Sequence, residues 1–191
     1  YTGEDTLSLH DALPIFRQAH TDAQTGLLNK VYAEHTISEW LREKDFEDLQ
    51  ALMMIDMDYF KQINDTYGHA TGDQVLKIFA GFLKEQFRTT DIIGRVGGDE
   101  FMILMKNVRL DYSIHLHLQK LYTNLQNIDI PELNDQKLSC SIGCAVAPTD
   151  AESFSQLYRL ADHALYTAKH NGRGRFVIYH DIKNQQETVL S

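Results

Sequence analysis

Residues 95–101 read Arg-Val-Gly-Gly-Asp-Glu-Phe. Gly97 and Gly98 lie between two hydrophobic runs, 91–96 and 101–105. Two glycines between strand-like runs predict a tight β-hairpin, because the central residues of such a turn favour positive φ. The carboxylates of Asp99 and Glu100 would repel each other there unless a cation neutralised them. The glycines would also let a ligand approach the backbone. On this pattern alone, a ligand-binding hairpin and a solvated acidic turn both remain open.

The composition limits the class of protein. The chain has 191 residues, 43% of them hydrophobic and 24% charged, which is ordinary for one globular domain with its own core. Its formal charge of −9 argues against a surface for nucleic acid or anionic lipid, because both require clustered Lys and Arg. No apolar run approaches the ~18 residues of a membrane span, so no membrane contact is expected in this fragment.

The two cysteines, Cys140 and Cys144, are four residues apart in a strand-like segment. At ~3.3 Å per residue their Cα atoms would be ~13 Å apart, beyond the ~7 Å limit for a disulfide. We therefore expect two free thiols in the core and a reducing, cytoplasmic location.

The first fifteen residues differ from the rest of the chain. Residues 6–15 resemble the in-frame translation of a common sequencing adapter, so residues 1–15 are interpreted as a non-native, disordered segment and excluded from the fold. An ordinary linker ending at Pro14 is the alternative. If the segment is an artefact, the natural N-terminus and an upstream sensory domain are missing from this sequence.

Helical and strand-like patterns alternate over residues 16–180, which are expected to form one domain followed by a polar tail, 181–191. Apolar residues at helical spacing predict helices at 29–44, 71–87, 110–127 and 153–171. Short apolar runs predict strands, besides the hairpin, at 51–57, 138–146 and 175–179. Ser153 and Gln156 form a capping-box pattern at the start of the last helix.

The hairpin determines the fold class. Its two strands must be antiparallel, so a purely parallel sheet is excluded. The prediction is an α/β (α+β) fold, with a central mixed, largely antiparallel sheet flanked by helices.

The predicted strand 51–57 ends in acid, with Asp56 and Asp58 two residues apart. Residues at this spacing share one face of a strand, although the chain is expected to leave the strand between them. A lone Asp at a strand end is usually a turn or helix-cap residue. Beside a second acidic hairpin, however, Asp56 predicts a Mg²⁺ site, because this ion takes one or two carboxylates plus substrate phosphates.

Polar residues after this strand fit a nucleotide base. Asn64 offers a donor and an acceptor, and Asp73 accepts two hydrogens, a combination suited to the edge of guanine. Lys61 lies in the same stretch. The alternative is that residues 64–68, Asn-Asp-Thr-Tyr-Gly, form only a turn.

With these residues the chain resembles the GGDEF family of diguanylate cyclase domains from about residue 19 to residue 179. A lone Gly-Gly-Asp-Glu would be weak evidence, but five motifs match in order and spacing. They are DAQTGLLN at 22–29, DMDYFK at 56–61, NDTYGHATGD at 64–73, GGDEF at 97–101 and ADHALYTAKHNGR at 161–173. The resemblance implies a palm like that of nucleotide cyclases.

The resemblance implies an enzyme that condenses two GTP into cyclic di-GMP and two pyrophosphates, with one GTP on each subunit of a homodimer. It implies that Mg²⁺ or Mn²⁺ is held by Asp56, the main-chain carbonyl of Met57, Asp99 and Glu100. Asp99 is the family's candidate base, with Glu100 and Lys61 assisting catalysis. An ordinary Asp, with pKa ~3.9, is too weak a base without the metal.

The resemblance also implies the contacts to the substrate. Asn64 and Asp73 would hold guanine, and Gly97 and Gly98 would lie against the nucleotide. Lys169 and Arg173 would reach the β and γ phosphates, with help from Lys61.

Arg88 and Asp91 match the family's RxxD motif, where bound cyclic di-GMP inhibits the enzyme. Arg88 can form paired hydrogen bonds with a phosphate or guanine, and Asp91 can accept from a guanine edge. Departures from the family pattern are few: Gln24 stands where Leu is usual, and Lys30 where Arg is usual.

The intact acids favour catalysis over the alternative, a silent module that binds GTP or cyclic di-GMP as a sensor. Asp73 suits the N1 and N2 hydrogens of guanine and not the N1 acceptor of adenine, which favours GTP.

Overall fold

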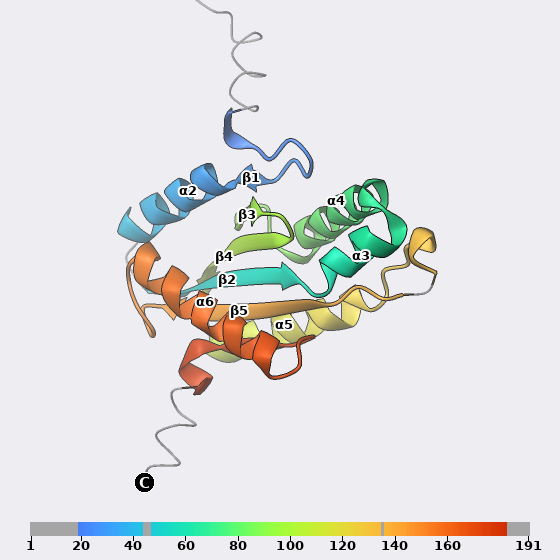
Figure 1. The fold of residues 1–191 in the computed structure, drawn as a ribbon. Helices are drawn as coiled ribbons and strands as arrows, with labels where there is room; N and C mark the ends of the chain where they lie inside the picture. Colours follow the sequence, from blue (N-terminus) through green and yellow to red (C-terminus); the bar gives the residue numbers. More distant parts are fainter. Residues whose placement is uncertain (1–18, 44–46, 135, 183–191) are drawn as a thin grey trace, which may run out of the picture.

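The computed structural model describes residues 19–43, 47–134 and 136–182, so the interpretation of residues 1–15 lies outside the described part of the chain. A six-stranded sheet has the order β1-β3-β4-β2-β5-β6 (Figure 1). Its strands are β1 Leu28–Asn29, β2 Leu49–Met57, β3 Ile92–Gly97, β4 Glu100–Val108, β5 Cys140–Ala147 and β6 Phe176–Ile178. The edge strands β1 and β6 pair in parallel, and the three inner pairings are antiparallel. The predicted mixed, largely antiparallel sheet is confirmed.

Besides the helical residues at 19–20 and 179–182, five α-helices and one 3₁₀ turn accompany the sheet within the described ranges. They are α2 Lys30–Glu43, α3 Phe60–Tyr67, α4 His69–Gln86, α5 Asp111–Leu125, α6 Phe154–His170 and the turn Pro131–Leu133. Four of the helices follow the predicted ranges closely. The turn interpretation of residues 64–68 is wrong, because Asn64 to Tyr67 belong to α3, which ends at Gly68 with φ 85°. No helix of the described residues is long and apolar enough to span a bilayer.

The helices cover both faces of the sheet (Figure 1). Along β2, Met53 and Ile55 belong to the core beneath α3, α4 and α5, whereas Leu52 and Met54 belong to the core beneath α2 and α6. Because alternate residues of a strand point to opposite faces, one apolar run supplies both cores. Cys140 and Cys144 are buried free thiols, as predicted.

The hairpin turn differs slightly from the sequence prediction. Gly97 pairs with Glu100, so the two residues between the strands are Gly98 and Asp99. Of the two glycines, only Gly98 has positive φ, at 52°. A register shift between Arg95 and Gly97 moves the turn by one residue, and the acid Asp99 consequently lies at the tip itself.

Strand β5 and helix α6 pack with almost no space between them. A Cβ atom placed on Gly143 would lie 2.1 Å from both the carbonyl oxygen of Ala161 and the backbone nitrogen of Leu165. Gly143 also pairs with Met54 of β2 and Val177 of β6. A side chain at this position is therefore sterically excluded by backbone atoms.

A histidine ties the end of the described chain to the domain. Residues 179–182 form a helical turn after β6, and His180 lies between two acids. Its Nδ1 is 3.3 Å from Oδ2 of Asp150, and its Nε2 is 3.1 Å from Oδ2 of Asp111. The hydrogen bond to Asp150, with further help from Asp111, raises the pKa of His180 to about 9 against the effect of burial.

This contact predicts a pH-dependent loss of stability. The contribution of His180 is complete below its unfolded pKa of 6.5 and is lost as the pH rises through about 9. Between about pH 6 and pH 9.5 the chain should lose about 2 kcal/mol more unfolding free energy than the His180→Ala variant. Urea unfolding at both pH values measures the difference, with exposed His35→Ala as control. An equal pH dependence in parent and His180→Ala would contradict the prediction.

Candidate functional site

The predicted metal residues meet where β2 ends and β4 begins. Asp56 pairs with Glu100 across the two strands. The backbone nitrogen of Met57 donates to the carbonyl oxygen of Asp99 at 3.2 Å, which closes the hairpin turn onto β2. The structure therefore gathers Asp56, Met57, Asp99 and Glu100 at one end of the two central strands.

Negative charge outweighs positive charge at this end of the strands. Burial raises the pKa of Asp56, and repulsion from Asp99 and Asp58 raises it further. The neighbouring ammonium of Lys169 acts in the opposite direction. Burial, followed by repulsion from Asp56, likewise raises the pKa of Glu100. Lys169 belongs to α6, and its Nζ lies 2.7 Å from Oδ2 of Asp56. Raised carboxylate pKa values indicate a cluster that additional positive charge would stabilise.

The donor set fits a hard cation only in part. Among the described residues no group of three or more His, Cys, Asp or Glu side chains is already arranged around a metal position. The paired acids Asp56 and Glu100 nevertheless offer only oxygen atoms as ligands. The main-chain carbonyl of Met57, the last residue of β2, follows Asp56 directly. Since Mg²⁺ takes one or two protein carboxylates and completes its shell with phosphates and water, these residues fit Mg²⁺ bound together with a nucleotide.

Asp58 has a different environment from Asp56, although the spacing placed both on one strand face. Asp58 is 5% exposed and accepts from the hydroxyls of Ser139 and Ser141, at 2.5 and 2.7 Å. It also accepts from the backbone nitrogen of Gly174 at 2.9 Å. No pattern in the sequence predicts this role for Asp58. Its carboxylate connects β5 to the loop between α6 and β6.

The same loop carries Arg173. This residue has φ 61°, and its guanidinium lies 5.3 Å from the centre of the Tyr59 ring. Lys169, in the last turn of α6, therefore lies beside Asp56, whereas Arg173 follows the end of this helix and lies beside Tyr59. Lys61 lies on the exposed side of α3, which starts just after β2.

The predicted guanine residues lie close together across two helices. A Cβ atom on Gly72 would be 1.9 Å from Oδ1 of Asn64, so the amide of Asn64 lies directly against α4. Asp73 is the next residue along α4 and its side chain is exposed. The absence of a side chain at Gly72 is what allows this approach.

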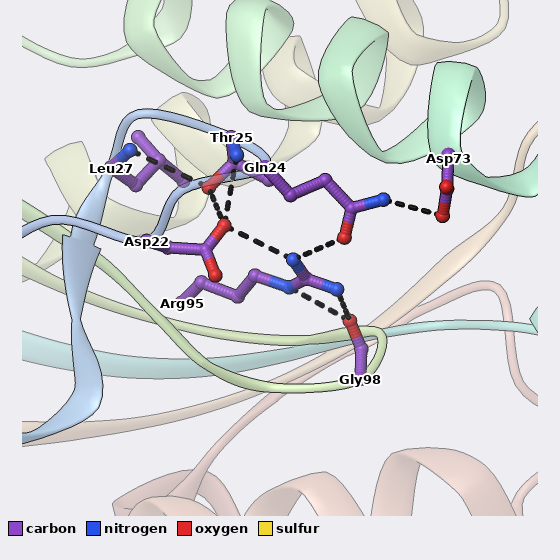
Figure 2. Close-up of polar contacts among 7 residues, drawn as sticks. All are labelled: Asp22, Gln24, Thr25, Leu27, Asp73, Arg95 and Gly98. Atoms are coloured by element: carbon purple, nitrogen blue, oxygen red, sulfur yellow. Dashed lines mark hydrogen bonds and ion pairs between the residues drawn. The ribbon is translucent and has the colours of Figure 1, made fainter.

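Arg95 holds the hairpin turn to the segment before β1 (Figure 2). Its Nε and Nη2 donate to the carbonyl oxygen of Gly98 at 2.9 and 2.7 Å, and its Nη1 donates to Oδ1 of Asp22 at 3.0 Å. Burial acts to raise the pKa of Asp22, but hydrogen bonds from Thr25 and the contact with Arg95 lower it below the usual value. Sequence reasoning missed Arg95 as a site residue, because its partner Asp22 lies 73 positions away and no local pattern indicates the contact.

Arg88 and Asp91 lie in the turn between α4 and β3. Both oxygens of Asp91 accept backbone hydrogen bonds, from Arg88 N at 2.8 Å and Lys106 N at 2.9 Å. Arg88 is exposed and, with Arg109 and Asp48, lines a surface hollow of about 470 Å³. Asp91 thus supports the turn, and Arg88 is exposed beside it.

The chain belongs to the GGDEF family: the family model described as "Diguanylate cyclase, GGDEF domain" matches residues 19–175. It is 35% identical over 171 residues to the probable diguanylate cyclase DgcT of Escherichia coli, covering 87% of this chain and 37% of that protein. It is 32% identical to the cyclic di-GMP phosphodiesterase PdeR of the same organism, covering 88% of this chain and 25% of that protein. The chain therefore spans well under half of these relatives.

Solved structures agree with the fold. The GGDEF domain of TpbB (YfiN) from Pseudomonas aeruginosa superposes with a TM-score of 0.78 at 32% identity, covering 87% of this chain and 99% of that one. The coiled coil and GGDEF domain of DgcB from Caulobacter crescentus, in complex with cyclic di-GMP, gives a TM-score of 0.80 at 25% identity, covering 88% and 90%. The family assignment made from the sequence is confirmed.

Proposed function

We propose that this domain is a diguanylate cyclase that condenses two GTP into cyclic di-GMP. The observation that carries the proposal is the pairing of Asp56 with Glu100 beside Asp99. Lys169 forms an ion pair with Asp56. This mixture of carboxylates and cations suits a triphosphate bound with a divalent ion. Relatives named as diguanylate cyclases support the same activity.

The nucleotide would lie across the hairpin turn. Asn64 and Asp73 would bind guanine, while Gly97 and Gly98 leave room for the nucleotide against the backbone. Lys169, Arg173 and Lys61 would bind the β and γ phosphates.

Asp56, the carbonyl of Met57, Asp99 and Glu100 would hold Mg²⁺ or Mn²⁺. When bound, the ion neutralises the triphosphate and lowers the pKa of the attacking ribose hydroxyl. With one GTP on each subunit of a homodimer, each 3′-oxygen attacks the other α-phosphorus. Two phosphodiester bonds form, two α–β bonds break, and two pyrophosphates and two protons leave. An N-terminal sensory domain and a cytoplasmic location fit this role.

The test is GTP turnover with Mg²⁺ by the chain from Phe16 onward, fused to a dimerising coiled coil, with the product identified by mass spectrometry. Cyclic di-GMP as product supports the proposal. A second candidate, a silent module that binds GTP or cyclic di-GMP as a sensor, is favoured by the match to a phosphodiesterase. Bound GTP and a dimer without any product would select this second function.

We also propose that cyclic di-GMP inhibits the enzyme through Arg88 and Asp91. Replacing Arg88 by alanine should abolish product inhibition and leave the initial rate unchanged, because Arg88 is exposed and away from the paired acids. Initial rates at increasing cyclic di-GMP measure this, with exposed Arg159→Ala as control. Arg88 is a cleaner probe than Asp91, whose carboxylate supports the turn. Unchanged inhibition in Arg88→Ala would contradict the proposal.

A further inference from the structure

We propose that Gln24 is a positioning residue for guanine recognition, because its amide holds the Asp73 carboxylate in one orientation. The inference rests on the proposed function, in which Asp73 binds guanine. It concerns a contact between the segment before β1 and the first turns of α4 (Figure 2).

The contact joins residues that are far apart in the sequence. Nε2 of Gln24 donates to Oδ1 of Asp73 at 2.5 Å, and Oε1 of Gln24 accepts from Nη1 of Arg95 at 2.6 Å. The Gln24 side chain is partly buried and lies between the two charged groups. It therefore connects Asp73, the residue proposed for the base, to Arg95, which holds the hairpin turn through Gly98.

Chemistry allows only one orientation of this amide. A guanidinium can only donate and an ionised carboxylate can only accept, so the oxygen of Gln24 must face Arg95 and its nitrogen must face Asp73. Arg95 is itself held firmly, since its side chain is 10% exposed and bonded to Asp22 and Gly98. The direction of the amide is thus set by a fixed neighbour.

Gln24 leaves the carboxylate able to bind a base. An ionised carboxylate has about four acceptor sites, and the amide of Gln24 occupies one of them. The remaining sites can accept the N1 and N2 hydrogens of guanine together. Two simultaneous bonds require the plane of the carboxylate to be fixed, whereas one bond tolerates rotation. An exposed Asp73 without Gln24 would have to lose that rotation on binding.

Two variants separate the two hydrogen bonds of Gln24. Gln24→Met has a similar volume and loses both bonds. Gln24→Glu can still accept from Arg95 but cannot donate to Asp73, and its charge repels that carboxylate. Gln74→Met is the matched control, because Gln74 is exposed, follows Asp73 directly and bonds to Glu132 instead.

The experiment is calorimetric binding of α,β-methylene GTP and of its inosine counterpart, with Mg²⁺, to the 191-residue chain. These analogues resist condensation, and inosine lacks the 2-amino group. Gln24→Met should weaken binding of the guanosine analogue about 5–10-fold and of the inosine analogue about 2-fold or less. Gln24→Glu should weaken guanosine binding at least as much, and Gln74→Met should change neither. Thermal unfolding of each variant confirms that it folds.

Asp73→Asn separates this inference from the proposed function. If Asp73 binds guanine, Asp73→Asn alone weakens the guanosine analogue, and adding Gln24→Met to it causes no further loss. Unchanged or tighter guanosine binding in Gln24→Met, or additive losses in the double variant, would overturn the positioning role alone. Unchanged binding in Asp73→Asn would instead overturn the assignment of Asp73 to the base.

Discussion

Replacing Asp99 by alanine is expected to abolish cyclic di-GMP synthesis, with kcat falling by at least about 10³-fold, because the proposed metal site loses the acid at the hairpin turn. The domain should remain folded. Asp99 raises the pKa of both Asp56 and Glu100, so its removal relieves repulsion in the folded state. The expected result is therefore loss of activity with an unchanged or higher Tm.

Turnover by the coiled-coil fusion and thermal unfolding of the same preparation measure the two effects. Asp129→Ala is the matched control, since it removes an exposed carboxylate from the loop after α5. Its activity and Tm should equal those of the parent. Cyclic di-GMP production by Asp99→Ala within tenfold of the parent would contradict the role of the turn in catalysis.

Replacing Gly143 by alanine should destabilise the domain by about 3–5 kcal/mol, the range of severe core mutations. The added Cβ would lie 2.1 Å from backbone atoms of Ala161 and Leu165, neither of which can rotate away. To relieve the overlap, α6 would have to move off β5. That movement would also displace Lys169 from Asp56.

Urea unfolding measures this change, and poor recovery of folded protein is the expected sign of a larger effect. Gly81→Ala is the control, because nothing lies within 4 Å of its Cβ position in the middle of α4. Alanine is about 1 kcal/mol more favourable than glycine in a helix, so this variant should be at least as stable as the parent. Equal stability of the two variants would show that α6 tolerates displacement.

The long elements could be predicted because their apolar spacing extends over many residues. The helix α4 carries apolar residues at helical spacing over several turns, and β2 is a continuous apolar run of strand length. The helix α3 was missed, because its eight residues include Asn, Asp and Thr, which are equally common in turns. The capping pattern of Ser153 is realised only as a side-chain bond to Gln156 at 2.9 Å, without a cap to the backbone.

The acids of the site could be predicted from motifs, but their neighbours could not. Residues 24 and 73 are separated by 49 positions, and no local pattern indicates that their side chains meet. The inward position of Asp58 depends on where β5 and the loop before β6 lie. These contacts depend on tertiary packing, which sequence periodicity does not encode.

Asp56 and Asp58 are therefore expected to be under different selection, one for the chemistry and the other for the fold. Asp56 faces the proposed substrate, whereas Asp58 bonds three groups of its own chain. A lineage that abandoned the chemistry but still used the fold would be free to lose Asp56 and would be constrained to retain Asp58. When genomes are surveyed for working enzymes of this kind, an acid at position 58 indicates only an intact scaffold.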